Sequence, residues 1–202
     1  MKLFSLILTI LGVASAEVIL NGACPAVEPV KDFDMNAYAG TWYEVKKLPL
    51  ANEGKGQCGT ALYTLDGDSY KVKNSHVING VEKYVTGTVN KAADANNAAK
   101  LQITVTVGRF TRVGPLWILA TDYSNYAVSY SCKYDQKSNT HRLNVWVLSR
   151  TKGLSSEVQA TVDAFLSSNF SNVDASKFVT IDLSEGACQT RSSRGYTAPV
   201  GH

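Results

Sequence analysis

Between residues 40 and 150, apolar and polar side chains alternate over short stretches that are separated by turn signals. Alternation with a period of two predicts β-strands that bury one face. Asp66-Gly67-Asp68 and Asn79-Gly80 are typical of the tight turns that join antiparallel strands. The eight strands expected from this pattern cover residues 40–48, 57–65, 69–78, 81–91, 100–108, 115–122, 125–134 and 141–149.

A helical periodicity follows the last of these strands. Apolar residues between 154 and 166 recur three and four positions apart, and Ser155 and Ser156 offer an N-cap. A final strand is expected at 177–183. Together these elements predict an all-β fold, an eight-stranded antiparallel up-and-down barrel with one C-terminal α-helix packed outside. A barrel of eight strands is wide enough for one small ligand.

The alternation also predicts which side chains point into the barrel. The aliphatic face of strand 141–149 suits the helix, and the lysines of strand 69–78 must face water. The opposite faces of both strands then line the interior. The inward residues expected on these strands are Tyr70, Val72, Asn74, His76, Arg142, Asn144 and Trp146.

Two further strands indicate a cavity instead of a packed core. With Cys132 on the outside, strand 125–134 turns the small residues Ala127, Ser129 and Ser131 inward, whereas strand 100–108 supplies aliphatic side chains. Small residues on one wall leave space that larger residues would fill. The aliphatic lining expected from strand 100–108 is Leu101, Ile103, Val105 and Val107. The polar groups expected near the mouth are Asn74, His76, Arg112 and Asn144.

Length and charge narrow the class of protein. A chain of 202 residues with 45% apolar content suits a single domain that buries a real core. The net charge of +3 comes from 20 basic and 17 acidic residues that are dispersed along the chain. We therefore expect no nucleic-acid partner.

The first sixteen residues read as a secretory signal peptide. Lys2 gives the positive start, residues 3–13 the apolar run, and Ala14-Ser15-Ala16 the cleavage pattern. No later stretch is apolar enough to cross a membrane, and the polar tail at 189–202 argues against a lipid anchor. We expect a secreted, extracellular protein whose residues 17–202 form one domain, without membrane insertion.

Candidate chemistry is sparse. The three histidines, His76, His141 and His202, lack metal-ligand spacing, and no nucleophile motif occurs, so we expect neither a metal site nor an enzyme. Asn169-Phe170-Ser171 matches an N-glycosylation acceptor. An even number of cysteines in a secreted chain predicts two disulfides. Cys24, Cys58, Cys132 and Cys188 allow three pairings by spacing alone.

Three short segments resemble the signature of the lipocalins. They are Gly40-Thr41-Trp42, Thr121-Asp122-Tyr123 and Arg150. We expect the Arg150 guanidinium to stack on the Trp42 indole, which buries the indole and ties a late strand to the first one. These segments indicate the closure of a barrel, and therefore a fold, without indicating chemistry.

The resemblance extends to one group, the insect bilin-binding lipocalins. The stretches that carry it are Lys47-Leu48-Pro49-Leu50, Gly56-Gln57-Cys58, Asn74-Ser75-His76, Thr121-Asp122-Tyr123-Ser124-Asn125-Tyr126, Val145-Trp146-Val147 and Gly186-Ala187-Cys188. The resemblance implies disulfides Cys24–Cys132 and Cys58–Cys188. It also implies a carrier, in haemolymph or a similar fluid, that holds biliverdin non-covalently for coloration or pigment storage. The ligand wall implied in this way is Asn74, His76, Val85, Val105, Val107, Phe110, Arg112, Ser131, Asn144 and Trp146.

Two regions depart from the pattern of that group. Residues 109–113, expected to form a mouth loop, and residues 83–100 are the least similar stretches. Because mouth loops select ligands, a carrier of another small hydrophobic ligand (a carotenoid, a retinoid or a fatty acid) is the alternative. The segment Thr121-Asp122-Tyr123-Ser124-Asn125-Tyr126 also resembles the carotenoid-binding crustacyanins. A homo-oligomer is compatible with the sequence.

Overall fold

The computed structural model describes residues 17–50, 56–107 and 109–191, with residue 107 described by its backbone alone. The signal peptide expected at residues 1–16 lies outside this part of the chain. No helix within the described ranges is long and apolar enough to span a membrane.

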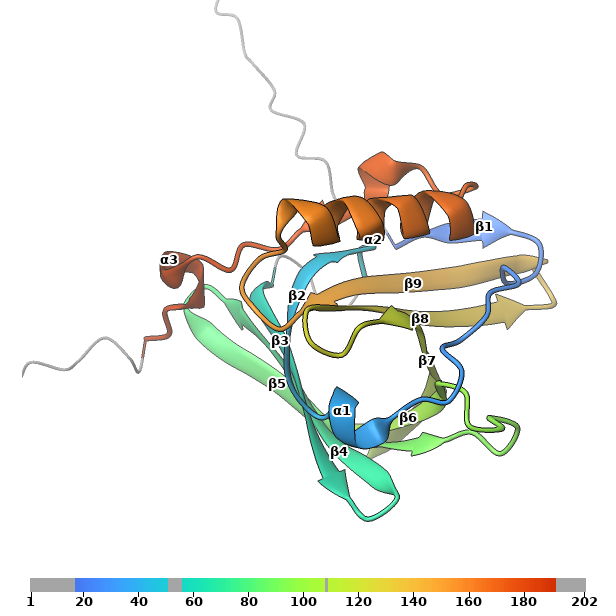
Figure 1. The fold of residues 1–202 in the computed structure, drawn as a ribbon, viewed down its shortest axis with the longest axis horizontal. Helices are drawn as coiled ribbons and strands as arrows, with labels where there is room; N and C mark the ends of the chain where they lie inside the picture. Colours follow the sequence, from blue (N-terminus) through green and yellow to red (C-terminus); the bar gives the residue numbers. More distant parts are fainter. Residues whose placement is uncertain (1–16, 51–55, 108, 192–202) are drawn as a thin grey trace, which may run out of the picture.

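The predicted barrel is confirmed (Figure 1). Eight successive strands pair antiparallel with their neighbours, and the last of them returns to pair with the first, which closes the sheet. These strands are β2 (Gly40–Lys47), β3 (Gln57–Asp66), β4 (Ser69–Ile78), β5 (Val81–Lys91), β6 (Lys100–Val107), β7 (Phe110–Thr121), β8 (Tyr126–Asp135) and β9 (Thr140–Ser149).

The expected helix is α2 (Ser156–Asn169), which begins after the N-cap Ser155. Figure 1 shows α2 lying over the outer side of β9 and β2. Its buried residues Val162 and Leu166 join a core cluster with the outward aliphatic residues of β9, Leu143, Val145 and Val147. The predicted aliphatic face of that strand is therefore the one that packs against α2.

Shorter elements complete the fold. Strand β1 (Ile19–Asn21) pairs with β9, α1 (Met35–Tyr38) precedes β2, and α3 (Glu185–Cys188) follows the barrel. The strand predicted at 177–183 is wrong in extent. Residues Ala175–Lys177 form a 3-10 turn capped by the Asp174 side chain, and only β10 (Val179–Thr180) pairs with β2.

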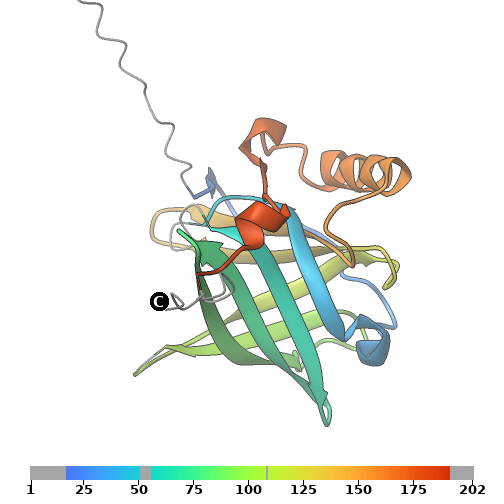
Figure 2. The same cartoon turned by 90° about the vertical axis from the view of Figure 1, so that its left-hand side faces the viewer.

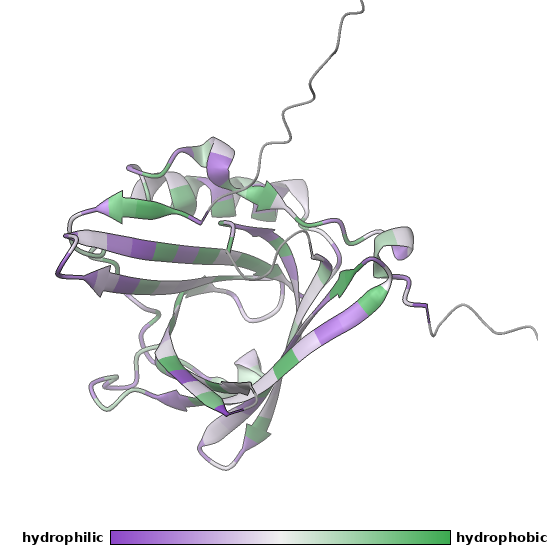
Figure 3. Ribbon diagram, turned by 180° about the vertical axis from the view of Figure 1, so that it is seen from behind, coloured by the Kyte–Doolittle hydropathy of each residue, from purple (hydrophilic) through white to green (hydrophobic). Residues whose placement is uncertain are grey.

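The barrel has a closed end and a mouth. At the closed end, α1 and the buried Trp42 belong to an inner cluster of aromatic side chains, and the expected stacking of Arg150 on Trp42 is confirmed. The mouth is formed by the opposite strand ends, where β4 meets β5 and β8 meets β9. Figure 3 shows hydrophilic and hydrophobic residues alternating along the barrel strands, as a wall with one face inside requires.

Two disulfides join the terminal segments to the barrel. Cys24 bonds Cys132 of β8, and Cys58 of β3 bonds Cys188 of α3. This is the pairing that the resemblance implies. Figure 2 shows α3 against the outer surface near the mouth end of β3. Both termini of the described domain are therefore covalently fixed to the outer wall.

Candidate functional site

The barrel contains a cavity of about 110 Å³ that opens toward the mouth. Its wall combines aliphatic and aromatic side chains with hydroxyl, amide and carboxylate groups, which is the composition expected of a site for a largely apolar ligand with polar edges. The residues that line it are Glu44, Ala61, Tyr63, Asn74, Ile103, Pro115, Leu116, Ser129, Ser131, Trp146 and Leu148.

The strand registers explain why these residues meet. Residues directly opposite each other on paired strands share a face of the sheet. Asn74 lies opposite Ala61, and Ser129 lies opposite Trp146, so all four point inward together. The small side chains on β8 face a large indole on β9 and leave space beside it. The predicted inward faces of β4, β8 and β9 thus meet in one cavity.

Three of the ten predicted wall residues line this cavity, namely Asn74, Ser131 and Trp146. Asn144 lies opposite Ser131 on the same inner face. The Oδ1 atom of Asn144 is buried and has no hydrogen-bond partner among the described residues. A buried amide oxygen without a donor is unfavourable, so this atom is suited to accept a hydrogen bond from a bound molecule.

The remaining predicted residues occupy the inner face nearer the mouth. Val85 lies opposite Asn74, and Val105 lies opposite Arg112. Phe110, which is 77% exposed, lies opposite the backbone of Val107. Val85, Val105, Phe110 and Arg112 are not among the side chains that line the cavity. The side chain of Val107 itself lies outside the described part of the chain.

His76 lies on the inward face of β4, opposite Lys83. A Cβ atom placed on Gly56 would lie 2.8 Å from the His76 ring, closer than side chains approach each other. Glycine at position 56 therefore lets the start of β3 pass close to the imidazole. The contact gives His76 a defined place beside the mouth.

Three tyrosines form the deep end of the site. Tyr63 makes edge contacts with Tyr38 and Tyr70, with ring centres 5.3 and 5.5 Å apart. Burial, followed by the neighbouring Tyr38, Tyr70 and Glu44, raises the pKa of the Tyr63 phenol well above its usual value. Tyr63 is therefore a neutral hydroxyl that can donate a hydrogen bond into the cavity.

Sequence reasoning missed the charged part of this wall. Glu44 lines the cavity, and its Oε2 atom lies 2.9 Å from Nζ of Lys47. Strict alternation places residues three positions apart on opposite faces, so the pattern gave no reason to bring them together. The signal that was available is the departure from alternation in Glu44-Val45-Lys46-Lys47, where a β-bulge occurs.

The predicted mouth loop at 109–113 is wrong, because residues 110–113 belong to β7. They continue the hairpin with β6, in which Val105 lies opposite Arg112 and Thr106 lies opposite Thr111. The two threonine hydroxyls are 3.0 Å apart. β-Branched residues and this cross-strand hydrogen bond favour extended backbone over a loop.

The mouth is open on the side where β7 and β8 meet. In the described part of the chain, β7 pairs with β8 only from Trp117 to Thr121. Beyond this point β7 stays paired with β6, and β8 stays paired with β9. Figure 1 shows these two hairpins diverging. The barrel is therefore wider at its mouth, where β7 and β8 are not paired, than toward its closed end, where they are.

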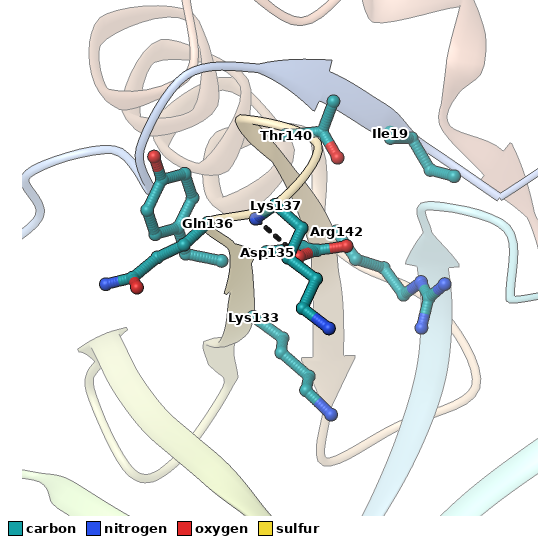
Figure 4. A pocket seen from close by; sticks show the side chains of 8 residues that line it. Ile19, Lys133, Asp135, Gln136, Lys137, Thr140 and Arg142 are labelled. Atoms are coloured by element: carbon teal, nitrogen blue, oxygen red, sulfur yellow. Dashed lines mark hydrogen bonds between the residues drawn. The ribbon is translucent and has the colours of Figure 1, made fainter.

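A hollow of about 640 Å³ lies at the mouth end of the β8–β9 hairpin. Figure 4 shows Lys133, Lys137 and Arg142 around it, with Asp135 among them. Lys133 and Arg142 lie opposite each other and follow the Ser131–Asn144 pair along the strands. Because alternate residues share a face, Lys133 and Arg142 continue the inner wall of the cavity toward solvent, and Lys137 lies in the turn that follows β8.

The structure gives little support to a metal site or to glycosylation. No group of three or more His, Cys, Asp or Glu residues within the described ranges is placed to hold a metal ion. The side-chain nitrogen of Asn169, the predicted glycosylation acceptor, donates a 3.0 Å hydrogen bond to the carbonyl oxygen of Phe165. A glycan on that nitrogen would have to be accommodated beside this contact.

Comparisons with known proteins agree with this geometry. Residues 39–185 match the model of the lipocalin / cytosolic fatty-acid binding protein family. The chain is 41% identical to insecticyanin-B of Manduca sexta, covering 98% of each chain. It is 40% identical to the bilin-binding protein of Pieris brassicae, covering 94% of this chain and 99% of the relative. The solved structure of Manduca sexta insecticyanin has a TM-score of 0.81, covering 87% of this chain and 94% of that one.

Proposed function

Because this chain belongs to the lipocalin family, and within it to the insect bilin-binding lipocalins, we propose that it is a secreted carrier of biliverdin. The pigment is held non-covalently in the barrel and serves coloration or pigment storage. The observation that carries the proposal is the mixed wall of the cavity, where Tyr63, Asn74 and Ser131 interrupt an apolar lining. A bent tetrapyrrole has the same character, since its frame is apolar and its inner edge carries nitrogen atoms.

The size of the cavity bears on how the pigment would lie. The cavity volume of about 110 Å³ is below the roughly 300–1,000 Å³ usual for ligand pockets. A tetrapyrrole would therefore extend past the cavity into the wider mouth, beside Val85 and Phe110. These inward-facing apolar side chains are 39% and 77% exposed, and a ligand would bury them.

The hollow at the mouth suits the two propionates of biliverdin. Lys133, Lys137 and Arg142 supply positive charge there, although Asp135 lies among them and Nε of Arg142 is 2.9 Å from Oε2 of Glu17. Charge-assisted hydrogen bonds between such groups and carboxylates are stronger than neutral ones. The proposed orientation places the propionates at the solvent edge and the pyrrole rings inside.

Cysteine chemistry supports non-covalent binding and secretion. All four cysteines of the chain form disulfides, so none is left to make a thioether with the pigment. Disulfides of this kind persist in oxidising, extracellular environments. The proposal includes no catalytic step.

The colour of the protein purified from its source tests this function. We expect a blue protein from which biliverdin is extracted by denaturation without chemical cleavage. A colourless protein that releases a fatty acid, or a yellow or red one that releases a retinoid or carotenoid, would refute the proposal and leave the fold unaffected.

A further inference from the structure

One ion pair lies inside the barrel instead of on its surface. The carboxylate of Glu44 and the ammonium of Lys47 are 2.9 Å apart, and their side chains are only 13% and 7% exposed. By contrast, the Lys73–Glu82 pair on the outer wall has side chains 41% and 43% exposed. Burying two charges is costly, and a buried pair is weak evidence of a purely stabilising role.

A bulge in β2 turns both charges inward. The register with β9 shifts between Glu44 and Lys46. As a result Glu44 lies opposite Leu148 and Lys47 lies opposite Trp146, and both of these partners line the cavity. Lys46 instead points outward, where its Nζ lies 3.1 Å from Oδ1 of Asp163 on α2. Without the bulge, one member of the Glu44–Lys47 pair would face the outside.

The neighbouring strand leaves room for the carboxylate. A Cβ atom on Gly59 of β3 would lie 2.6 Å from Oε2 of Glu44, so any larger residue would force the carboxylate to move. Glu44 is thus enclosed by Gly59 on one side and paired with Lys47, and it borders the cavity. Its position is fixed by the local structure of two strands.

A carboxylate at this place constrains the chemistry of the ligand. It accepts hydrogen bonds and donates none when ionised. A hydrocarbon chain against it would remove water from a charge and return no hydrogen bond. A pyrrole or lactam N–H would form a charge-assisted hydrogen bond with it. The wall at Glu44 therefore favours a ligand that presents N–H groups over a simple hydrocarbon.

We propose that Glu44, held by Lys47 and Gly59, is a specificity-determining residue that accepts hydrogen bonds from the N–H edge of the ligand. This inference rests on the proposed function and adds to it the contact that separates a tetrapyrrole from a carotenoid, retinoid or fatty acid. Lys47 acts as a positioning residue, because it holds the carboxylate and balances its charge.

The test compares the unaltered protein with E44Q, the double variant E44Q/K47M and the control E82Q. The double variant avoids leaving a lone ammonium in the barrel, so it remains folded if the single variant does not. Glu82 lies opposite Val77, on the outer face, and makes an ion pair of its own. Each protein is titrated with biliverdin by visible absorption and with retinol by fluorescence, after its folding is checked by circular dichroism.

We expect E44Q and E44Q/K47M to bind biliverdin roughly tenfold or more weakly and with a displaced visible band. Retinol affinity should be unchanged or higher, and E82Q should match the unaltered protein. Equal biliverdin affinity and an identical band in a folded Glu44 variant would overturn the inference alone. An equal loss for retinol would also overturn it, because it would indicate general distortion. Failure of the unaltered protein to bind biliverdin would overturn the proposed function, and the inference with it.

Discussion

The guanidinium of Arg150 lies 3.7 Å from the centre of the Trp42 indole ring and covers a side chain that is completely buried. The same guanidinium donates hydrogen bonds of 2.9–3.2 Å to the carbonyl oxygens of Tyr123, Thr41, Ala37 and Tyr38. One side chain thus joins the end of β9 to α1, to β2 and to the turn after β7. The closed end of the barrel depends on it.

Replacing Arg150 by Met should therefore destabilise the barrel strongly. The change removes four hydrogen bonds to carbonyl oxygens, of which that of Tyr38 still accepts one from the Trp42 indole N–H. We expect a loss of about 3–5 kcal/mol in the free energy of unfolding. Urea unfolding followed by tryptophan fluorescence measures this loss. The matched control is Lys71→Met, which removes an exposed ion pair and should cost less than about 1 kcal/mol. Similar losses in the two variants would show that Arg150 makes no special contribution.

Removing either disulfide should lower stability without changing the fold. Cys24–Cys132 and Cys58–Cys188 close loops with sequence separations of 108 and 130 residues. Because cross-links of this span restrict the unfolded chain, replacing a pair by serine should cost roughly 2–5 kcal/mol. Thermal melting of C24S/C132S and of C58S/C188S, each beside the oxidised parent, measures the effect. A variant that melts with the parent would contradict this expectation for its bridge.

The mouth of the barrel offers a matched pair of positions for testing ligand contact. Phe110 and Val113 are both exposed, at 77% and 58%, but they differ by an odd number of positions on β7 and so face opposite sides. Phe110 shares the inner face with Arg112, which lies opposite Val105.

We expect Phe110→Ser to weaken biliverdin binding by roughly five- to thirtyfold, the loss that burial of an aromatic side chain implies. Val113→Ser should leave the affinity unchanged. Dissociation constants from visible absorption titrations check both outcomes. Equal effects at the two positions would mean that the inner face of β7 at its mouth end does not contact the ligand.

High pH should unfold the barrel through its buried tyrosines. Burial raises the pKa of Tyr130 from 10.0 to about 12, and burial raises the pKa values of Tyr38, Tyr63 and Tyr70 as well. The folded state therefore holds these protons more tightly than the unfolded state. The resulting stability is fully present below pH 10 and is lost progressively as pH rises through the raised values.

Unfolding free energies measured from neutral pH into the alkaline range, with tyrosinate absorbance followed in parallel, check this expectation. Stability should begin to fall near pH 10, and the buried phenols should ionise together with unfolding. Ionisation of every tyrosine in a protein that keeps its native circular dichroism would contradict it.

The barrel was predictable from sequence because alternation records burial directly. The period of two placed Asn74, Ser131 and Trp146 on inner faces once the lysines, the aliphatic face of strand 141–149 and Cys132 had marked the outer ones, and the structure brings the three into one cavity. Turn residues such as Asn79-Gly80 fixed where strands end. These signals are local, and the barrel is built from local hairpins, so the sequence pattern was sufficient.

Irregular features were not predictable in the same way. The bulge between Glu44 and Lys46 brings Glu44 and Lys47 to the same face of β2, and the departure from alternation in Glu44-Val45-Lys46-Lys47 is only a weak sign of it. Residues 109–113 were expected to form a mouth loop, with the next strand beginning only at residue 115. In the structure Gly114 and Pro115 lie within β7, opposite Ile103 and Gln102, since pairing with β6 outweighs the local preference.

A titration of the ligand-free protein with biliverdin, followed by visible absorption, tests the central claim most directly. We predict a saturable rise of a red-region band that is complete at one equivalent, together with quenching of tryptophan fluorescence, because Trp146 lines the cavity. Absence of a saturable band, or a band that retinol or a fatty acid removes at equal concentration, would contradict the claim that this barrel is built to carry biliverdin.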